Sequence, residues 1–160
     1  STLDRSSAAS DVYKRQDYVL DGYVKKAGTN FVLSVGRLIG SQPELKGEQR
    51  LRKEDIYWEM PRCYQWDITV NLPEGYRISP EGLERLNVKV ENDCGAFIVQ
   101  ATTEDGTLRI KAEKRINHKT EPVANWEKLL EITDAANSYE ALSIVFQATI
   151  NPPTSPTTGY

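Results

Sequence analysis

The sequence feature that most constrains the fold is a strict alternation of apolar and polar side chains between Cys63 and Leu72. Its apolar members are Trp66, Ile68, Val70 and Leu72, and its polar members are Gln65, Asp67, Thr69 and Asn71. Because side chains of a strand point alternately to the two faces of a sheet, this run predicts a strand with one buried and one solvated face. Each buried apolar side chain contributes roughly 1.5–3 kcal/mol before entropy is subtracted. Pro73 and Gly75 end the strand, because proline lacks an amide donor and glycine permits a turn.

The same two-residue period recurs along the rest of the chain and predicts a series of hairpins. Strands are expected at 18–24, 31–35, 56–60, 76–79, 86–90, 97–101, 108–112 and 142–146. Turn residues separate them at 27–30 and at Glu104-Asp105-Gly106. Repeated hairpins at this spacing are typical of an antiparallel sandwich.

One segment has a helical period instead. Asn125 can cap its start, and the apolar residues that follow are spaced three and four apart: Trp126, Leu129, Leu130 and Thr133. The sequence therefore predicts a mainly β fold, an antiparallel β-sandwich of the Ig-like type, with one C-terminal helix before the last strand.

Composition and charge limit the classes of protein to which the chain can belong. A chain of 160 residues with 39% hydrophobic and 27% charged residues has an ordinary globular balance and is long enough for one domain with a substantial core. A net charge of −3 argues against a nucleic-acid partner. No apolar run reaches the ~20 residues that a membrane-spanning helix needs. The acidic turns at 91–93 and 104–105 hold too few oxygens for calcium, and no phosphate-binding glycine motif is present, so no cofactor or metal is predicted.

The two ends of the chain differ in character from the segment between them. Residues 6–16, SSAASDVYKRQ, resemble a translated sequencing adapter, so residues 1–16 are interpreted as a non-native, disordered segment. We expect a single β-sandwich domain over 17–148. The tail at 149–160 is rich in Pro, Thr and Ser and is expected to be disordered. The native sequence upstream of Asp17 is then not represented, so the lack of a signal peptide says nothing about compartment.

The residues that could form a catalytic centre are few. The single histidine, His118, could be combined with Cys63 or Cys94 and an aspartate, but a thiol nucleophile needs a base within hydrogen-bonding reach. Neither cysteine is expected at a helix N-terminus, where the pKa of its thiol would be lowered. We therefore predict that the chain is not an enzyme and has no catalytic residues. Two free thiols and one disulfide between neighbouring strands both remain open for Cys63 and Cys94.

Exposed aromatic and basic residues are the other candidates for a site. Trp66 and Trp126 are in phase with core positions, whereas the strand that holds Trp58 is shorter and leaves its role open. The cluster Arg50, Arg52 and Lys53 is interpreted as a solvated edge or, alternatively, as a docking patch. The candidate binding surface is formed by Tyr57, Trp58, Arg50 and Arg52.

Four motifs in order resemble one family. They are an RxxDIY-like opening at 52–57, LPEGY at 72–76, a VENxxG-like turn at 90–95 and HxxxPxANW at 118–126. Together they resemble the β-rich C-terminal domain of unknown function that follows the papain-like core of bacterial transglutaminase-like proteins. The resemblance implies an exported protein, periplasmic or in the cell envelope, whose catalytic Cys, His and Asp belong to a core outside this sequence.

The resemblance leads to two hypotheses about function. The first is a non-catalytic accessory domain whose partner is the transglutaminase-like core of the same native chain, against which it packs or which it positions. The second is an independent module that binds a glycan or a protein through the aromatic side chains near Tyr57 and Trp58.

Overall fold

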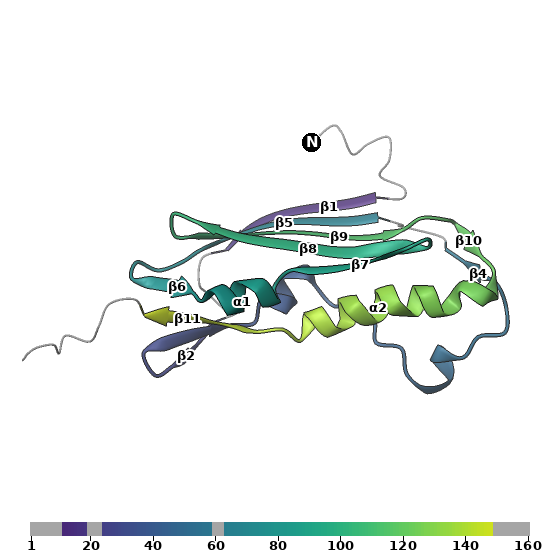
Figure 1. Cartoon of the computed structure of the whole chain (residues 1–160), viewed down its shortest axis with the longest axis horizontal. Coiled ribbons are helices and arrows are strands. Elements are labelled where there is room, and N and C mark those ends of the chain that lie inside the picture. Colours follow the sequence, from purple (N-terminus) through teal and green to yellow (C-terminus); the bar gives the residue numbers. More distant parts are fainter. Residues whose placement is uncertain (1–10, 19–23, 59–62, 149–160) are drawn as a thin grey trace, which may run out of the picture.

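A five-stranded sheet forms one layer of the protein (Figure 1). The structure is a computed structural model and describes residues 11–18, 24–58 and 63–148. The strands of this larger sheet lie in the order β1-β5-β9-β8-β7. They are β1 (Asp11–Tyr18), β5 (Cys63–Asn71), β7 (Val88–Asn92), β8 (Gly95–Glu104) and β9 (Thr107–Ile116). All neighbours are antiparallel except β1, which runs parallel to β5.

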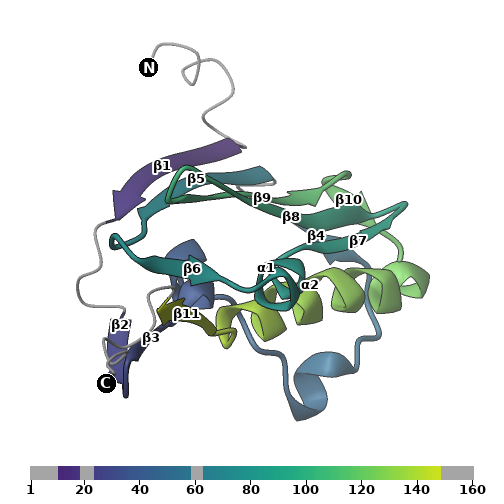
Figure 2. The same cartoon turned by 60° about the vertical axis from the view of Figure 1, so that its left-hand side comes forward.

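A helix and a smaller sheet share the second layer, on the same side of the larger sheet (Figures 1 and 2). The helix is α2 (Trp126–Glu140). The smaller sheet has the order β2-β3-β11-β6, with β2 (Val24–Ala27), β3 (Asn30–Leu33), β6 (Tyr76–Ile78) and β11 (Ile144–Ala148). A two-stranded pair, β4 (Ile56–Tyr57) and β10 (Thr120–Glu121), lies at one end. The short helices are α1 (Pro80–Arg85) and the 3-10 helices η2 (Val35–Ile39), η3 (Gly47–Arg50) and η4 (Val123–Asn125).

The main core lies between these two layers, and the alternation in the sequence produces it. Three alternate residues on each of β5, β8 and β9 are buried in it: Trp66, Ile68, Val70, Phe97, Val99, Ala101, Leu108, Ile110 and Ala112. The second layer contributes Ile132, Ala136, Tyr139, Ile144 and Phe146. The alternating run from Cys63 to Leu72 therefore packs its apolar face against the second layer.

Two of the predicted turns are confirmed in detail. Glu104 pairs with Thr107, and the two residues between them have positive φ, 51° at Asp105 and 76° at Gly106. Positive φ at both central positions is the requirement of the type I′ turn, which Asp-Gly satisfies. The turn at 27–30 likewise joins β2 to β3, with Gly28 at φ 67°.

The prediction of a mainly β chain with antiparallel sheets and a C-terminal helix before the last strand is confirmed. The Ig-like form of the sandwich is not confirmed, because α2 occupies part of the second layer. α1 was not predicted, and the strand expected to begin at Leu86, directly after it, begins at Val88 as β7. The Gly82 amide donates to Ser79 Oγ at 3.0 Å and Pro80 begins the helix, so N-terminal capping prevails there over the alternating pattern.

The N-terminal segment departs from the prediction in part. Residues 11–16 were expected to be disordered, but the structure places them in β1, where Asp11 pairs with Cys63 and Gln16 with Ile68. A strand edge can pair with any extended backbone, because the ladder uses main-chain groups rather than side chains. Residues 1–10 and 149–160, and parts of the strands expected at 18–24 and 56–60, lie outside the described residues.

Candidate binding pocket

A pocket of about 490 Å³ opens between the larger sheet, α2 and the segment that follows η2. Four aromatic side chains line it: Trp58, Tyr64, Trp66 and Trp126. The Tyr64 and Trp66 rings are stacked, with centroids 5.8 Å apart and planes at 12°. We call this hollow the aromatic pocket. It contains all three tryptophans of the chain.

A lysine lies on the inner face of the larger sheet and lines the same pocket. Lys114 on β9 has the same phase as Ile110, Ala112 and Ile116, which are buried. It pairs in register with Tyr64 on β5, whose ring also belongs to the pocket. The strand period therefore directs an ammonium group to the apolar side of the sheet.

The electrostatic state of Lys114 follows from this position. Its Nζ donates to Gln42 Oε1 at 3.2 Å, and no salt bridge to it occurs within the described residues. Burial lowers the pKa of the Lys114 ammonium below its usual range, because a low-dielectric environment disfavours the charged form. The pocket therefore contains a cation that is poorly compensated.

Gln42 is held in place by α2. Its backbone N–H donates to Glu140 Oε1 at 2.6 Å, and its backbone carbonyl accepts from Asn137 Nδ2 at 3.3 Å. Its side-chain Nε2 donates to the Ile39 carbonyl at 3.2 Å, which leaves the amide oxygen for Lys114. Gln42 is 8% exposed, so this polar wall of the pocket is fixed rather than solvated.

The four residues of the predicted binding surface make different contacts in the structure. Arg50 is turned onto α2, where its two terminal nitrogens donate to Asp134 at 3.0 and 2.7 Å. This bidentate pair holds the pKa of Asp134 below its usual range. The Arg52 guanidinium lies 5.3 Å from the centroid of the Trp126 ring, at a cation–π distance.

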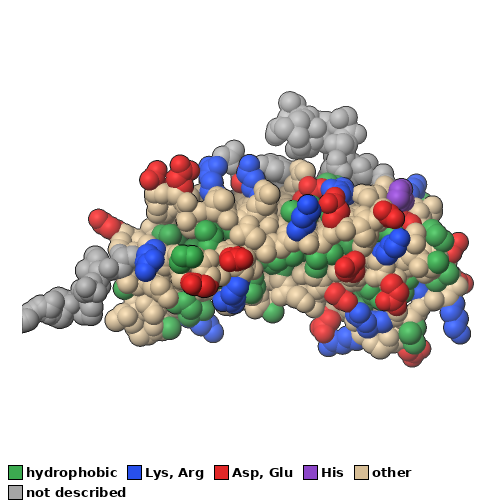
Figure 3. Space-filling model, in the orientation of Figure 1, with side chains coloured by type: hydrophobic (Ala, Val, Ile, Leu, Met, Phe, Trp, Pro, Cys, Tyr) green, Lys and Arg blue, Asp and Glu red, His purple; other side chains and the backbone are tan. Residues whose placement is uncertain are grey.

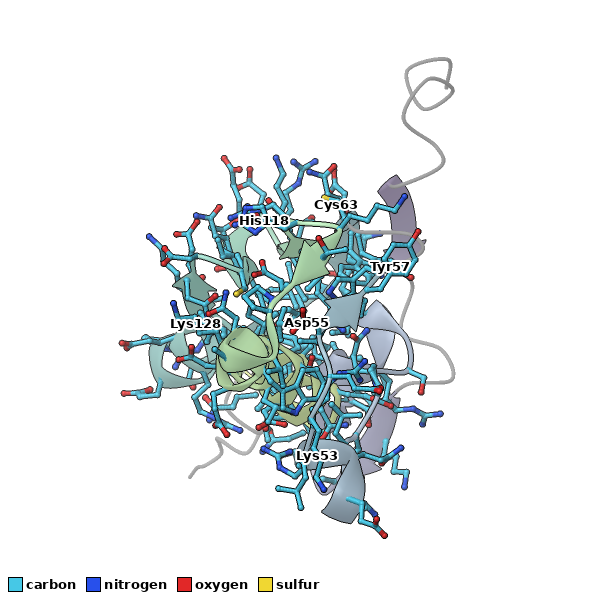
Figure 4. The ribbon with its side chains drawn as sticks, turned by 90° about the vertical axis from the view of Figure 1, so that its right-hand side faces the viewer. Lys53, Asp55, Tyr57, Cys63, His118 and Lys128 are labelled. Atoms are coloured by element: carbon cyan, nitrogen blue, oxygen red, sulfur yellow. The ribbon has the colours of Figure 1, made fainter. Side chains whose placement is uncertain are left out.

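The two aromatic residues of that surface are also separated. Tyr57 is 56% exposed, with Lys119 Nζ 5.3 Å from its ring centroid, whereas Trp58 lines the aromatic pocket. Figure 4 shows Tyr57 at an edge of the molecule, well apart from Lys53. The structure thus brings Trp58 to the pocket and leaves Tyr57 on the outside.

A second polar cluster surrounds Glu121, which is 4% exposed. Asn125 Nδ2 donates to its Oε1 at 2.9 Å, and His118 Nδ1 lies 2.5 Å from its Oε2. Burial alone would raise the pKa of Glu121, but hydrogen bonds from Asn125, His118 and the Cys94 thiol together lower it. Asn125 begins α2 as predicted, but its side chain binds Glu121 instead of capping the helix.

The hydrogen bonds of this cluster are not arranged as in a cysteine-dependent catalytic site. The Glu121 carboxylate bonds to both the Cys94 thiol and His118, where a nucleophilic thiol would need the imidazole itself. Burial, followed by the nearby Glu121 charge, raises the pKa of the Cys94 thiol, which keeps it protonated. No disulfide joins Cys63 to Cys94, so of the two alternatives that the sequence left open the bridge is not present.

Surface charge on one face, and the possible metal ligands among the described residues, do not point to another site. Acidic and basic side chains are interspersed on the face shown in Figure 3. Within the described ranges, no group of three or more His, Cys, Asp or Glu residues is arranged to hold a metal ion. None of the helices described is both long enough and apolar enough to span a bilayer.

Comparison with known families shows to which family the chain belongs. The model of a domain of unknown function with a solved structure, DUF3858, matches residues 35–146. The chain belongs to the DUF3858 family. All four motifs noted in the sequence fall inside the matched range, so the resemblance to a domain of unknown function is confirmed, whereas the transglutaminase-like context stays a prediction.

The DUF3858 domain also resembles a solved structure from Parabacteroides distasonis, described as a "putative protease", with a TM-score of 0.55 and 8% identity. The match covers 85% of this chain and 26% of that one, so the chain spans about a quarter of the solved protein. At this identity the likeness shows the fold alone. No curated protein is similar enough in sequence to count as a relative.

The polar residues of the pocket in this DUF3858 domain were not predicted. The strand was predicted only as far as Ala112, although Lys114 continues the same phase and Ile116 follows it. A lysine at a core position of a strand was therefore a readable signal. Gln42 had no such signal, since it lies in an irregular segment.

Proposed function

We propose that this DUF3858 domain is a non-catalytic accessory domain that packs against, or positions, another domain of its native protein. The observation that carries the proposal is the Glu121 cluster. The buried Cys94 thiol has a raised pKa and is bonded to a carboxylate, so this cluster does not activate its thiol as a nucleophile.

The proposed partner is a transglutaminase-like catalytic core in the same native chain. Two observations support a multidomain context: the ordered motifs between residues 52 and 126, and the solved structure of which this chain covers 26%. We propose further that the native protein is exported to the periplasm or cell envelope, which rests on the family resemblance.

The test starts from the coding sequence that flanks this one in the source DNA. The neighbouring core, expressed with and without the DUF3858 domain, is compared in melting temperature and in hydrolysis of a peptide substrate. We expect the core to hold the activity, the isolated DUF3858 chain to have none, and the joined protein to melt at a higher temperature than the core alone.

Matched variants distinguish an accessory from a catalytic role. Cys94→Ala and His118→Ala in the joined protein are expected to leave the turnover number unchanged. Loss of turnover in either variant without loss of melting temperature, or a flanking sequence without a papain-like core, would refute the proposal.

The second candidate is a module that binds a glycan or a protein by itself, and the exposure of the Tyr57 ring favours it. Aromatic faces suit sugar rings, and exposed aromatic side chains are frequent anchors of interfaces. A glycan array probed with the wild type and with Tyr57→Ala tests this role. Val145→Ala serves as the control, because Val145 is also an exposed apolar residue. A flat response of the wild type would count against a glycan ligand.

A further inference from the structure

We propose that the aromatic pocket binds a small organic carboxylate, with an aromatic body between the tryptophan side chains and the carboxylate on Lys114. This inference goes beyond the accessory role and does not depend on it. It concerns a ligand of this domain, whatever the domain packs against.

The size and walls of the pocket fit a ring-bearing small molecule. Its volume of about 490 Å³ lies within the ~300–1,000 Å³ that is usual for small-molecule sites. Trp58, Trp66 and Trp126 offer flat apolar surface, and aromatic rings prefer stacked or edge-on contacts with such walls.

The charge of the pocket selects the polar group of the ligand. Among the described residues that line it, Lys114 alone is charged. An ammonium has three N–H donors, and the one acceptor that the described chain supplies to Lys114 is Gln42 Oε1. Arg52 does not line the pocket, but its positive charge lies 5.3 Å from the ring centroid of Trp126, one of the lining residues.

A further donor without an acceptor belongs to one of the lining tryptophans, but it lies below the accessible surface. The Trp58 Nε1 hydrogen is buried and has no hydrogen-bond partner among the described residues. Only Lys114 is shown to offer donors to a ligand, and a lysine side chain can only donate, so the N–H groups it has beyond the one bonded to Gln42 call for acceptor oxygens. A carboxylate supplies these oxygens and also the negative charge that Lys114 lacks.

Because the pKa of the Lys114 ammonium is lowered, we expect the charge of the ligand to decide how tightly it binds. A carboxylate bound in a low-dielectric pocket stabilises the ammonium, whereas an amide of the same shape brings an oxygen without the charge. The competing explanation is that the lysine stem covers the aromatic wall while its ammonium reaches water. That explanation predicts no preference between acid and amide.

The test uses 4-phenylbutyrate, its uncharged analogue 4-phenylbutanamide and the cation 4-phenylbutylamine, titrated into the full chain while tryptophan fluorescence is recorded. All three tryptophans line the pocket, so a bound ring is expected to change the emission. We expect 4-phenylbutyrate to bind about tenfold or more tightly than the amide, and the amine to bind weakest.

Matched variants assign that preference to one side chain. Lys114→Met keeps the length and apolar stem, and is expected to bind acid and amide equally within about twofold. Lys111→Met is the control, because Lys111 lies on the same strand but on its exposed outer face. It is expected to keep the wild-type preference.

A second variant keeps the proposal testable if Lys114→Met does not fold. Gln42→Glu places a carboxylate where Gln42 Oε1 now lies, 3.2 Å from Lys114 Nζ, and is expected to weaken binding of 4-phenylbutyrate but not of the amide. Equal affinity of the wild type for acid and amide would overturn the proposal, and so would a complete lack of response. Binding of a phenylalanine-ending peptide without binding of 4-phenylbutyrate would overturn the small-molecule assignment.

Discussion

One added methyl group at Gly36 is expected to destabilise this domain strongly. Gly36 lies in η2, where the chain passes the C-terminal end of α2, and its N–H donates to the Leu142 carbonyl at 2.9 Å. A β-carbon at Gly36 would lie 1.9 Å from the Tyr139 carbonyl oxygen and 2.5 Å from that of Glu140. Both neighbours are backbone atoms, so no side chain can turn away to relieve the overlap.

The magnitude follows from how far η2 would have to move. An ordinary carbon–oxygen contact is about 3.3 Å, so Gly36→Ala requires a retreat of roughly 1.4 Å. That retreat breaks the hydrogen bond to Leu142 and leaves a buried amide unpaired, at about 1–3 kcal/mol. It also disturbs the packing of Val35, Leu38 and Ile39, and overpacking of this kind costs roughly 1–3 kcal/mol. The free energy of unfolding should therefore fall by about 4 kcal/mol.

Thermal and urea denaturation measure this change. At about 2–4 °C per kcal/mol for a domain of this size, Gly36→Ala should melt about 8–16 °C below the wild type. Gly28→Ala is the control: it also adds a methyl group, but Gly28 has φ 67° with no atom within 4 Å, so the cost is the left-handed conformation alone, about 1–2 kcal/mol. A loss at Gly36→Ala no larger than at Gly28→Ala would refute the steric argument.

The remaining predictions concern the polar cluster and the thiols. Glu121→Gln is expected to lose about 1–3 kcal/mol at neutral pH, because a buried charged acceptor is removed. Since the folded pKa of Glu121 is lowered, its contribution is present above about pH 4.3 and is lost as the pH falls further, so the urea midpoints of the two proteins should converge at acid pH. A difference independent of pH would contradict the lowered pKa. Iodoacetamide at neutral pH should modify Cys63 and spare the buried Cys94 until urea unfolds the chain, as peptide mass spectrometry can show. Faster alkylation of Cys94 would contradict its raised pKa.

Some residues of the candidate site could be identified from the local sequence pattern, whereas the contacts of others depend on residues far away in the chain. Trp58 was identified because an aromatic residue on a short strand is conspicuous in the sequence. Arg50 was identified for its charge, but its role depends on Asp134, which lies 84 residues further along the chain. A pairing over such a separation has no local signature, so only the packing of η3 on α2 could assign it.

The sequence by itself determined most of the strands, the hairpin turn at 104–107 and the position of the long helix, although not β1 or β10. These features depend on neighbours within a few residues: alternation places side chains on two faces, and Asp105-Gly106 accepts the positive φ of its turn. Local capping at Ser79 was readable in the same way, although the alternating pattern beside it obscured α1.

Only the tertiary structure decided what the second layer contains and what lies between the layers. The smaller sheet and α2 share one face of the larger sheet, and this depends on how their apolar surfaces fill the same space. Lys114 and Gln42 meet across 72 residues of chain. Whether a core-phase lysine is paired, solvated or directed into an aromatic pocket depends on the elements that fold over it, and no periodicity within one strand contains that information.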